Sequence, residues 1–349
     1  MVIWLNLNDN KHMSYDWFIG IDISKATFDV AFCRSVYPEK YTHKKFDNTL
    51  SGFKKMVIWL KEKGVNLSQS FFGMEHTGVY VLHLCTYLEQ KGIDYSLENP
   101  LEIKRSMGIQ RGKNDKVDSY RIVSFLFSRR HKLTPKPLAS KTILKIKSLL
   151  GYRERTIKTK VSLEQNLQDM KDTKDLIDNS LVISMSEQQL EIIKVQLKEI
   201  DKILREIVAK DYSLKRNFNL TVSVPGIGLI TGLYFLVYTQ NFTAFPNGRK
   251  FASFSGVAPF EYSSGVSIRG KTRVSPLANK KMKALLSNCA CTAIQHDSEL
   301  KNYYQRKKQQ GKEKCVALNA VKAKLINRVF SVVKRKSEYI PFEEFRQVV

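Results

Sequence analysis

Residues 17–33 read WFIGIDISKATFDVAFC, and this stretch decides the fold. Its two β-rich runs, residues 17–23 and 27–33, flank the short polar segment 24–26, and this pattern predicts two antiparallel strands joined by a hairpin. Asp22 lies inside the first apolar run, where a carboxylate is costly to bury unless it binds a cation or hydrogen-bond donors. The stretch therefore predicts a β-sheet with a charged group near the end of its first strand.

Alternating strand and helix signals continue as far as residue 128. Further β-rich runs and further apolar residues at helical spacing predict strands at 41–46, 70–74 and 93–97, and helices at 53–63, 79–90 and 117–128. Three antiparallel strands followed by the order α-β-α-β-α are expected for an RNase H-like (RuvC-like) domain with a mixed five-stranded sheet. We assign this domain to residues 1–138.

A long helical arm is predicted for residues 139–215, which follow two prolines, contain none themselves and are rich in Lys, Glu, Gln, Leu and Ile. Six apolar residues of this segment are spaced 3-4-3-4-3, namely Leu190, Ile193, Leu197, Ile200, Leu204 and Ile207. The spacing favours a coiled-coil seam, although a plain amphipathic helix fits so short a run nearly as well. We predict a spacer through which the chain dimerises.

The last part of the chain, residues 216–349, is predicted to be mainly helical. Helical spacing covers residues 277–294 and 317–333, with a charged segment at 301–314 between them. The sequence VSVPGIG at residues 222–228, followed by an apolar run, has the form of a helix-hairpin-helix turn whose glycines let backbone N–H groups approach a phosphate. A tight turn packed in a core fits this motif equally well.

Positive charge is concentrated in two regions. The 349 residues include 58 Lys and Arg against 33 Asp and Glu, a net charge of +25. Residues 101–160 hold 17 basic against 4 acidic side chains and residues 241–349 hold 21 against 7, whereas residues 1–100 hold 11 of each. Such clustering is typical of proteins that bind polyanions, so the charge indicates a nucleic-acid-binding protein.

The composition also bears on the compartment. A hydrophobic content of 43% excludes a disordered chain. The five cysteines form no CxxC pair, and the first residues lack the pattern of a secretory signal. The charge-free stretch 217–248 is broken by Pro and Gly and falls short of the roughly 20 apolar residues of a membrane span. We expect a cytoplasmic protein without membrane contact.

Four carboxylates are the candidate metal ligands. Asp22 lies in the first strand, Glu75 follows the predicted strand 70–74, and Asp115 and Asp118 lie three apart at the start of a predicted helix, on one helical face. Carboxylate oxygens suit Mg²⁺, and two such ions support phosphoryl transfer. Taken singly, each acid also has a plain structural interpretation, because acids favour helix N-termini and turns. The four together indicate a metal-dependent nuclease site.

A second candidate site is the segment 261–273, EYSSGVSIRGKTR, which we expect to be a loop. Arg269, Lys271 and Arg273 could neutralise a phosphate, and a serine hydroxyl becomes a nucleophile only where such help is present. The residues alone favour a phosphate-binding turn over a nucleophile.

Several motifs together resemble one family. GIDISKATFDV, EHTGVY and KNDKVDS in the first part of the chain, and SVPGIGLITG, FASFSGVAP and EYSSGVSIRGKTRVSPLANKKMKALL in the last, are similar to the DEDD transposases of the IS110 insertion-sequence family. The resemblance covers roughly residues 17–336. It implies a RuvC-like domain, a coiled-coil spacer and a C-terminal transposase domain.

The resemblance also implies the chemistry. The family's serine corresponds to Ser264, with Ser263 and Ser267 as weaker alternatives, and it attacks DNA to form a covalent intermediate beside Mg²⁺ bound by Asp22, Glu75, Asp115 and Asp118. Two Mg²⁺ per site are expected, with Mn²⁺ as a substitute. The implied partners are donor and target DNA, a guide (bridge) RNA, and further copies of the chain in a homodimer or a dimer of dimers.

Nucleic-acid binding is assigned to nine cations of the two basic regions: Arg105, Arg111, Lys113, Lys116, Arg269, Lys271, Arg273, Lys280 and Lys281. Three other functions remain open at this point. A RuvC-like nuclease or junction resolvase would use the acids and water, and leaves the serine segment unexplained. A DNA invertase of the same superfamily differs only in its substrate. A non-catalytic nucleic-acid scaffold would not need both the acids and the serine.

Overall fold

The computed structural model describes residues 15–76, 78–106, 115–173, 175–264 and 268–341, without the side chains of residues 262, 264, 268, 269 and 271. The chain divides into two compact units, Met1–Leu138 and Ala139–Val349. The division lies next to the pair of prolines that precedes the predicted arm. The further boundary at residue 215 stays a prediction.

Unit 1 is built on a five-stranded mixed sheet with the strand order β3-β2-β1-β4-β5. Strands β1 and β2 and strands β2 and β3 pair antiparallel, whereas β1 pairs parallel with β4 and β4 with β5. The strands are β1 (Trp17–Ile23), β2 (Thr27–Arg34), β3 (Tyr37–Asp47), β4 (Ser70–Glu75) and β5 (Tyr95–Glu98). This arrangement confirms the predicted RNase H-like fold class.

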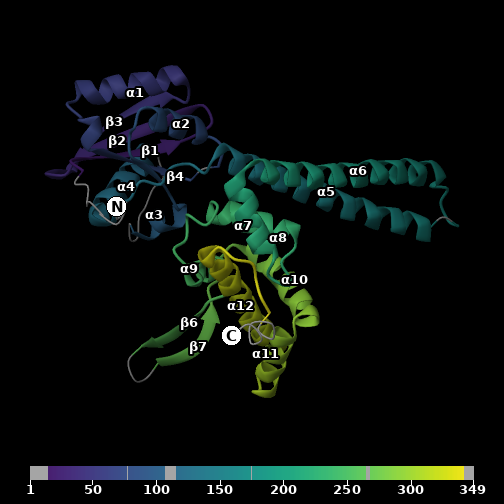
Figure 1. The fold of residues 1–349 in the computed structure, drawn as a ribbon. Coiled ribbons are helices and arrows are strands. Elements are labelled where there is room, and N and C mark those ends of the chain that lie inside the picture. Colours follow the sequence, from purple (N-terminus) through teal and green to yellow (C-terminus); the bar gives the residue numbers. More distant parts are fainter. Residues whose placement is uncertain (1–14, 77, 107–114, 174, 265–267, 342–349) are drawn as a thin grey trace, which may run out of the picture. The chain divides into compact units, whose positions relative to one another are not determined.

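Helices cover both faces of this sheet (Figure 1). Helices α1 (Leu50–Glu62) and α2 (Leu82–Gln90) pack on the face that carries Ile19 and Ile21 of β1. Helices α3 (Pro100–Ser106) and α4 (Asp115–Ser128) pack on the face that carries Phe18 of β1. The two apolar cores explain why residues of β1 on both faces are buried, as expected for a central strand of a sheet that helices cover on both faces.

Two glycines bring α4 unusually close to the sheet. A Cβ atom on Gly20 of β1 would lie 2.5 Å from the Ser119 carbonyl oxygen and 2.6 Å from the Val123 nitrogen, both in the α4 backbone. A Cβ atom on Gly73 of β4 would lie 2.6 Å from the Leu126 side chain. In each strand the acid comes two residues later, so the close approach of α4 sets the position of its first turn beside those acids.

Replacing Gly20 by Ala should therefore destabilise unit 1 by about 3 kcal/mol, because the α4 backbone must move. Gly92→Ala is the matched control: Gly92 has a φ of +63°, and a Cβ atom there would have no other atom within 4 Å, so only the left-handed strain of about 1–2 kcal/mol applies. Denaturant unfolding followed by tryptophan fluorescence reports on unit 1, whose sequence holds all three tryptophans. Equal losses for the two variants would contradict this account.

The two edges of the sheet differ. Strand β5 is short, and on its open side the Lys136 N–H donates a hydrogen bond of 2.8 Å to the Tyr95 carbonyl oxygen. Strand β3 is 11 residues long and forms the opposite edge, where Lys40, Lys44 and Lys45 are exposed. Charged side chains on an edge strand oppose pairing with another sheet.

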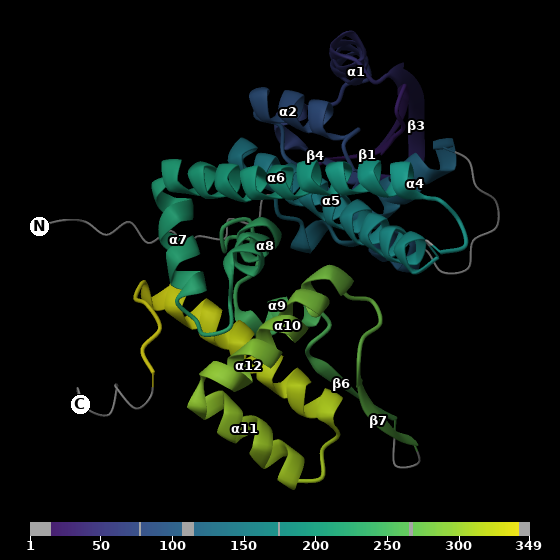
Figure 2. The same cartoon turned by 90° about the vertical axis from the view of Figure 1, so that its right-hand side faces the viewer.

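Unit 2 begins with the predicted arm. Helices α5 (Lys141–Asp172) and α6 (Ser180–Lys210) run side by side (Figure 2), and Leu190, Ile193, Ile200 and Leu204 of the predicted seam are buried. Leu197 and Ile207 of the seam are half-buried. The start of α5 and the end of α6 join the core of the remaining helices.

The rest of unit 2 is helical apart from one hairpin. Its elements are α7 (Tyr212–Val222), α8 (Leu229–Thr239), α9 (Gly248–Phe254), β6 (Pro259–Ser264), β7 (Ile268–Val274), α10 (Lys280–His296), α11 (Ser298–Gln309) and α12 (Lys314–Arg335). Two local expectations were wrong: the segment 261–273 lies largely in the strands β6 and β7, and the charged segment 301–314 is mostly the helix α11. Among the described residues of this helix, only Leu300 is buried, while Tyr303 and Tyr304 pack against the core from a half-buried position.

The glycine turn between α7 and α8 packs against α10. Gly226 has a φ of +87°, and a Cβ atom there would lie 2.6 Å from the Cys289 carbonyl oxygen. This glycine is therefore required by backbone conformation and packing, whereas Gly228 has open space around it. Across the described ranges, no helix combines the length and apolar character needed to cross a membrane.

Candidate functional site

Asp22 and Glu75 lie at the same end of the sheet. In the parallel pairing of β1 with β4, Gly20 lies opposite Gly73 and Ile21 opposite Met74, so Asp22 and Glu75 come next in register. Both side chains belong to the face covered by α4, because they lie two residues after the glycines under that helix. Each is half-buried. The carboxyl ends of two neighbouring parallel strands thus place two acids side by side.

Asp115 and Asp118 occupy the first turn of α4. The Asp118 side chain is 21% exposed and the Asp115 side chain 64% exposed. Ser119, one residue further, is the residue whose backbone lies over Gly20. The first turn of α4 therefore lies over the sheet end that carries Asp22.

Electrostatics show that the four predicted acids share one environment. Burial raises the pKa of Asp22 from 3.8 to about 6, and the charges of Asp118, Asp115, Glu75 and Asp29, in that order, contribute to the rise. A carboxyl group close to four other carboxylates destabilises the folded protein, because like charges at short range repel one another. Such convergence is typical of sites that bind a cation or a substrate.

Asp29 is an acid that the sequence analysis missed. It pairs with Asp22 across β1 and β2, is 5% exposed, and its Oδ1 lies 2.7 Å from the His43 Nε2. The signal was present, since an acid in the apolar run TFDVAFC is as unusual as the one in FIGIDI. A turn at residues 24–26 would place Phe28 opposite Asp22, whereas in the structure Ile23 pairs with Phe28 and Asp29 therefore lies opposite Asp22.

Cations compensate part of this negative charge. Arg121 forms an ion pair with Asp118 at 2.5 Å. The Lys45 Nζ lies 3.5 Å from Asp29 Oδ2 and 3.8 Å from Asp115 Oδ2, so Lys45 connects the edge strand β3 to the start of α4. The acid cluster is therefore bordered by cations on the side of β3 and along α4.

The carboxylates lie near one another without forming a coordination sphere. Within the ranges that the structure covers, no three His, Cys, Asp or Glu side chains are close enough together to hold one ion. Asp29 and Asp115 are instead paired with Lys45, and Asp118 with Arg121. The donor set nevertheless fits a divalent cation, because it offers several hard oxygen ligands whose repulsion a cation would relieve.

The serine segment forms an antiparallel hairpin in unit 2. Ser263 pairs with Arg269 and Ser264 with Ile268, so Ser264 is the last residue of β6. Residues 265–267, including the alternative Ser267, lie outside the described residues, as do the side chains of Ser264, Arg269 and Lys271. The pairing does place a serine backbone and an arginine backbone directly opposite each other at this end of the hairpin.

The other predicted nucleic-acid contacts have varied surroundings. Arg105, Lys116, Arg273 and Lys280 are exposed, and the Lys116 Nζ lies 5.8 Å from the centre of the Tyr120 ring. Lys281 is half-buried and pairs with Glu154 Oε2 at 3.2 Å, so it has a role within unit 2. Arg111 and Lys113 lie outside the described residues.

Comparisons with known proteins agree on one class. A family model described as a transposase, of the DEDD IS110 type, matches residues 19–172, and a model of the transposase IS116/IS110/IS902 family matches residues 219–305. The first match contains all four predicted acids and the second contains Ser264.

Related proteins support the same class. The pilin gene-inverting proteins of Moraxella bovis and Moraxella lacunata are each 25% identical over 327 residues, which cover 92% of this chain and 97% of the relative. An uncharacterized 43.6 kDa protein of insertion element IS110 from Streptomyces coelicolor is 30% identical over 117 residues, 34% of this chain and 29% of that protein. Transposases are recombinases whose substrate is DNA. The two models and the relatives together show that this chain belongs to the IS110 family of transposases.

Proposed function

We propose that the protein is a site-specific DNA recombinase, the transposase of an insertion sequence, that uses a metal-binding carboxylate cluster and a serine nucleophile. The observation that carries this proposal is the convergence of Asp22, Glu75, Asp115 and Asp118, from three separate elements, on one end of the sheet. Family membership supplies the substrate class, and the carboxylates supply a place for phosphoryl transfer.

The proposed cofactor is Mg²⁺, bound by these four carboxylates, with two ions per site and Mn²⁺ as a substitute. Bound metal would polarise the scissile phosphate and offset the charge that develops on its oxygens. The protein itself positions the ligands. The sheet fixes Asp22 and Glu75, and the close packing of α4 on Gly20 fixes the helix that carries Asp118.

In the proposed reaction, the Ser264 hydroxyl attacks the scissile phosphate and displaces one deoxyribose oxygen. The product is a protein–DNA phosphodiester, and a free hydroxyl from the partner strand then displaces the serine. Each step exchanges one phosphodiester for another, so strand exchange needs no ATP. The cations of β7, Arg269, Lys271 and Arg273, are proposed to bind the phosphates beside the serine.

A bridge RNA is proposed to choose the donor and target DNA, with the two basic regions of the chain binding nucleic acid. DNA inversion is the second candidate function, and the long match to the pilin gene-inverting proteins favours it. Both reactions cut and rejoin strands, and they differ in whether the substrate is a mobile element or an inverted segment.

The test is strand exchange between two differently labelled duplexes, one containing the junction of the element's ends and one its target, with Mg²⁺ and the RNA that co-purifies with the protein. Joined products that carry both labels support the proposal. Breaks with free 5′-phosphates alone would establish the nuclease instead. Efficient recombination by nucleic-acid-free protein would refute the guide RNA.

Self-association is proposed to use a second apolar stripe on α6. Leu181, Met185, Ile192 and Val195 are between 58% and 72% exposed and are spaced 4, 7 and 3 residues apart. This spacing is that of a coiled-coil seam, and it lies on a different side of α6 from the buried Leu190 and Ile193. A homodimer, or a dimer of dimers, would bury it.

Ile192→Glu combined with Val195→Glu should convert the dimer to a monomer in analytical ultracentrifugation, because each substitution places a charge in an apolar seam. Lys198→Glu combined with Arg205→Glu, at exposed positions of α6 away from the stripe, is the control and should leave the dimer intact. A dimer that survives the first pair of substitutions would place the interface elsewhere.

A further inference from the structure

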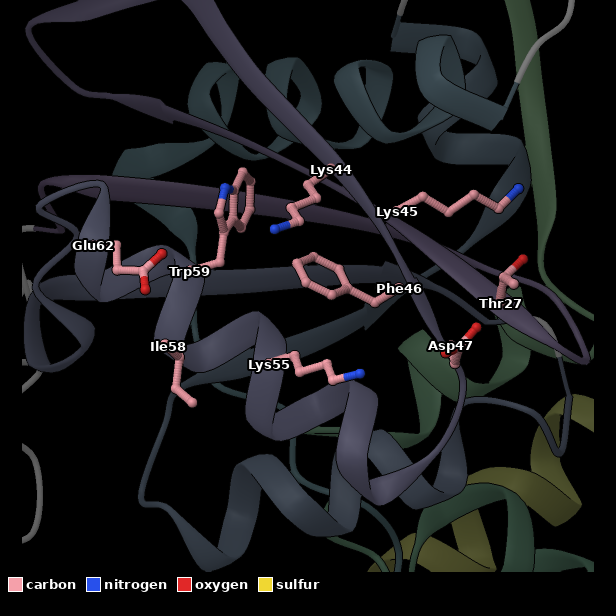
Figure 3. Close-up of a pocket in the computed structure, with 9 residues that line it drawn as sticks. All are labelled: Thr27, Lys44, Lys45, Phe46, Asp47, Lys55, Ile58, Trp59 and Glu62. Atoms are coloured by element: carbon pink, nitrogen blue, oxygen red, sulfur yellow. The ribbon is translucent and has the colours of Figure 1, made fainter.

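A basic pocket lies between the edge strand β3 and helix α1. It has a volume of about 450 Å³ and is lined by Thr27, Lys44, Lys45, Phe46, Asp47, Lys55, Ile58, Trp59 and Glu62. Figure 3 shows the Lys44 and Lys55 side chains on either side of the Phe46 ring. The Lys44 Nζ lies 5.6 Å from the centre of that ring. The pocket therefore combines two ammonium groups with an aromatic floor.

Lys44 and Lys55 are available to a ligand. Both are exposed, and neither takes part in an ion pair within the part of the chain that the structure describes. Phe46 and Trp59, which form the floor, are 7% and 6% exposed and belong to the apolar core. The floor is thus fixed by packing, while the cations above it can rearrange around a phosphate.

Lys45 connects this pocket to the carboxylate cluster. It lines the pocket and also lies within 4 Å of Asp29 and Asp115. Asp22, Asp29 and Lys45 form one row across β1, β2 and β3. With neighbouring strands about 4.8 Å apart, the row spans about 10 Å from Asp22 to Lys45. Measured along the helix axis, that span corresponds to about three base pairs of B-form DNA at a rise of about 3.4 Å each.

We propose that Lys44, Lys45 and Lys55 bind the phosphodiester backbone of the DNA strand that is cut, within a few nucleotides of the scissile phosphate. The inference rests on the proposed function, because the carboxylate cluster is what places the cut. Continuity with that cluster through Lys45 selects the reacting DNA strand over the guide RNA. The carboxylates of Asp47 and Glu62 also line the pocket. Because they repel phosphate, we expect the phosphates to bind on the side of the pocket where the three lysines lie.

The test is DNA binding in EDTA, where no strand is cut, measured at several salt concentrations. Lys44→Gln combined with Lys55→Gln should weaken binding about tenfold and reduce the slope of log affinity against log salt by about 2, one for each lost phosphate contact. Lys54→Gln combined with Lys61→Gln removes the same charge from α1 outside this pocket and is the control. Equal losses in the two double variants would overturn the proposal.

A crosslink locates the strand. With p-benzoylphenylalanine in place of Ile58, which is 56% exposed and lines the pocket, irradiation should crosslink DNA within a few nucleotides of the cut site. Crosslinks to co-purified RNA alone, or to distant DNA, would overturn the proposal. Both experiments are run without metal and do not require strand cleavage. Their results therefore test the DNA contact even if the proposed roles of the serine and the metal are refuted. A loss of strand exchange in Asp22→Asn with normal DNA binding would test the chemistry separately.

Discussion

Asp22→Asn is expected to abolish strand exchange, with a loss of about 10³-fold or more, because it removes a charged ligand at the centre of the carboxylate cluster. DNA binding should be retained. The same variant should lose the thermal stabilisation that Mg²⁺ gives the wild-type protein, since ligand binding to the folded state raises its stability. The measurement is a rejoining assay together with melting curves in EDTA and in Mg²⁺. Unchanged strand exchange in this variant would refute the proposal that the four carboxylates bind the catalytic metal.

Without metal, the same substitution should stabilise the protein at neutral pH. The folded-state pKa of Asp22 is raised from 3.8 to about 6, so the folded state binds this proton more tightly than the unfolded chain does. Above pH 6 the ionised group therefore costs stability, and the cost disappears as the pH falls toward 4. For a half-buried group we expect a gain of about 1–2 kcal/mol for Asn at about pH 7. Melting in EDTA at neutral pH and near pH ~4 checks the sign.

Ser264→Ala is expected to eliminate the covalent protein–DNA adduct and to lower strand exchange by about 10⁴-fold or more, as for other lost nucleophiles. DNA and RNA binding should persist, because a hydroxyl contributes little to a phosphate contact that cations dominate. End-labelled DNA and a denaturing gel detect the adduct as a band of reduced mobility that protease removes.

Ser263→Ala is the matched control, since Ser263 is the neighbouring residue of β6, is exposed and pairs with Arg269. It should keep the adduct. An adduct that persists in Ser264→Ala and disappears in Ser263→Ala would identify Ser263 as the nucleophile. An adduct that persists in both would refute a nucleophile in β6.

The sheet was predictable because each strand has a local signal. The runs around Asp22 and Glu75 are short, apolar and bounded by turn residues, and the order of the elements fixed the fold class. The hairpin of β6 and β7 was missed for the opposite reason. Apart from Phe260 and Tyr262 in β6 and the two ends of β7, its residues are small, polar or charged, so the alternation of apolar residues is too short to predict the hairpin. Helix α11 was missed because Leu300 is its one buried residue among those described.

The acids were predictable as a set, but their surroundings were not. The spacing of three residues predicted that Asp115 and Asp118 share one face of a helix. The strand order explains why Asp22 and Glu75 lie next to each other. The buried Asp29 follows from the register of β1 with β2, and the bridging Lys45 follows from the register of β2 with β3, which shifts between Phe32 and Arg34. The role of Gly20 is also hidden in the sequence, because it depends on how close α4 lies to the sheet in three dimensions.

The lysines on the open edge of β3 have a consequence for solubility. An edge strand of 11 residues has one side open to pairing with another chain, and the ammonium groups on β3 that we propose to bind DNA also oppose such pairing. Their replacement by apolar residues would therefore favour aggregation, whereas glutamine keeps the edge hydrated. The lysines of this edge would then serve two purposes, DNA binding and protection against aggregation.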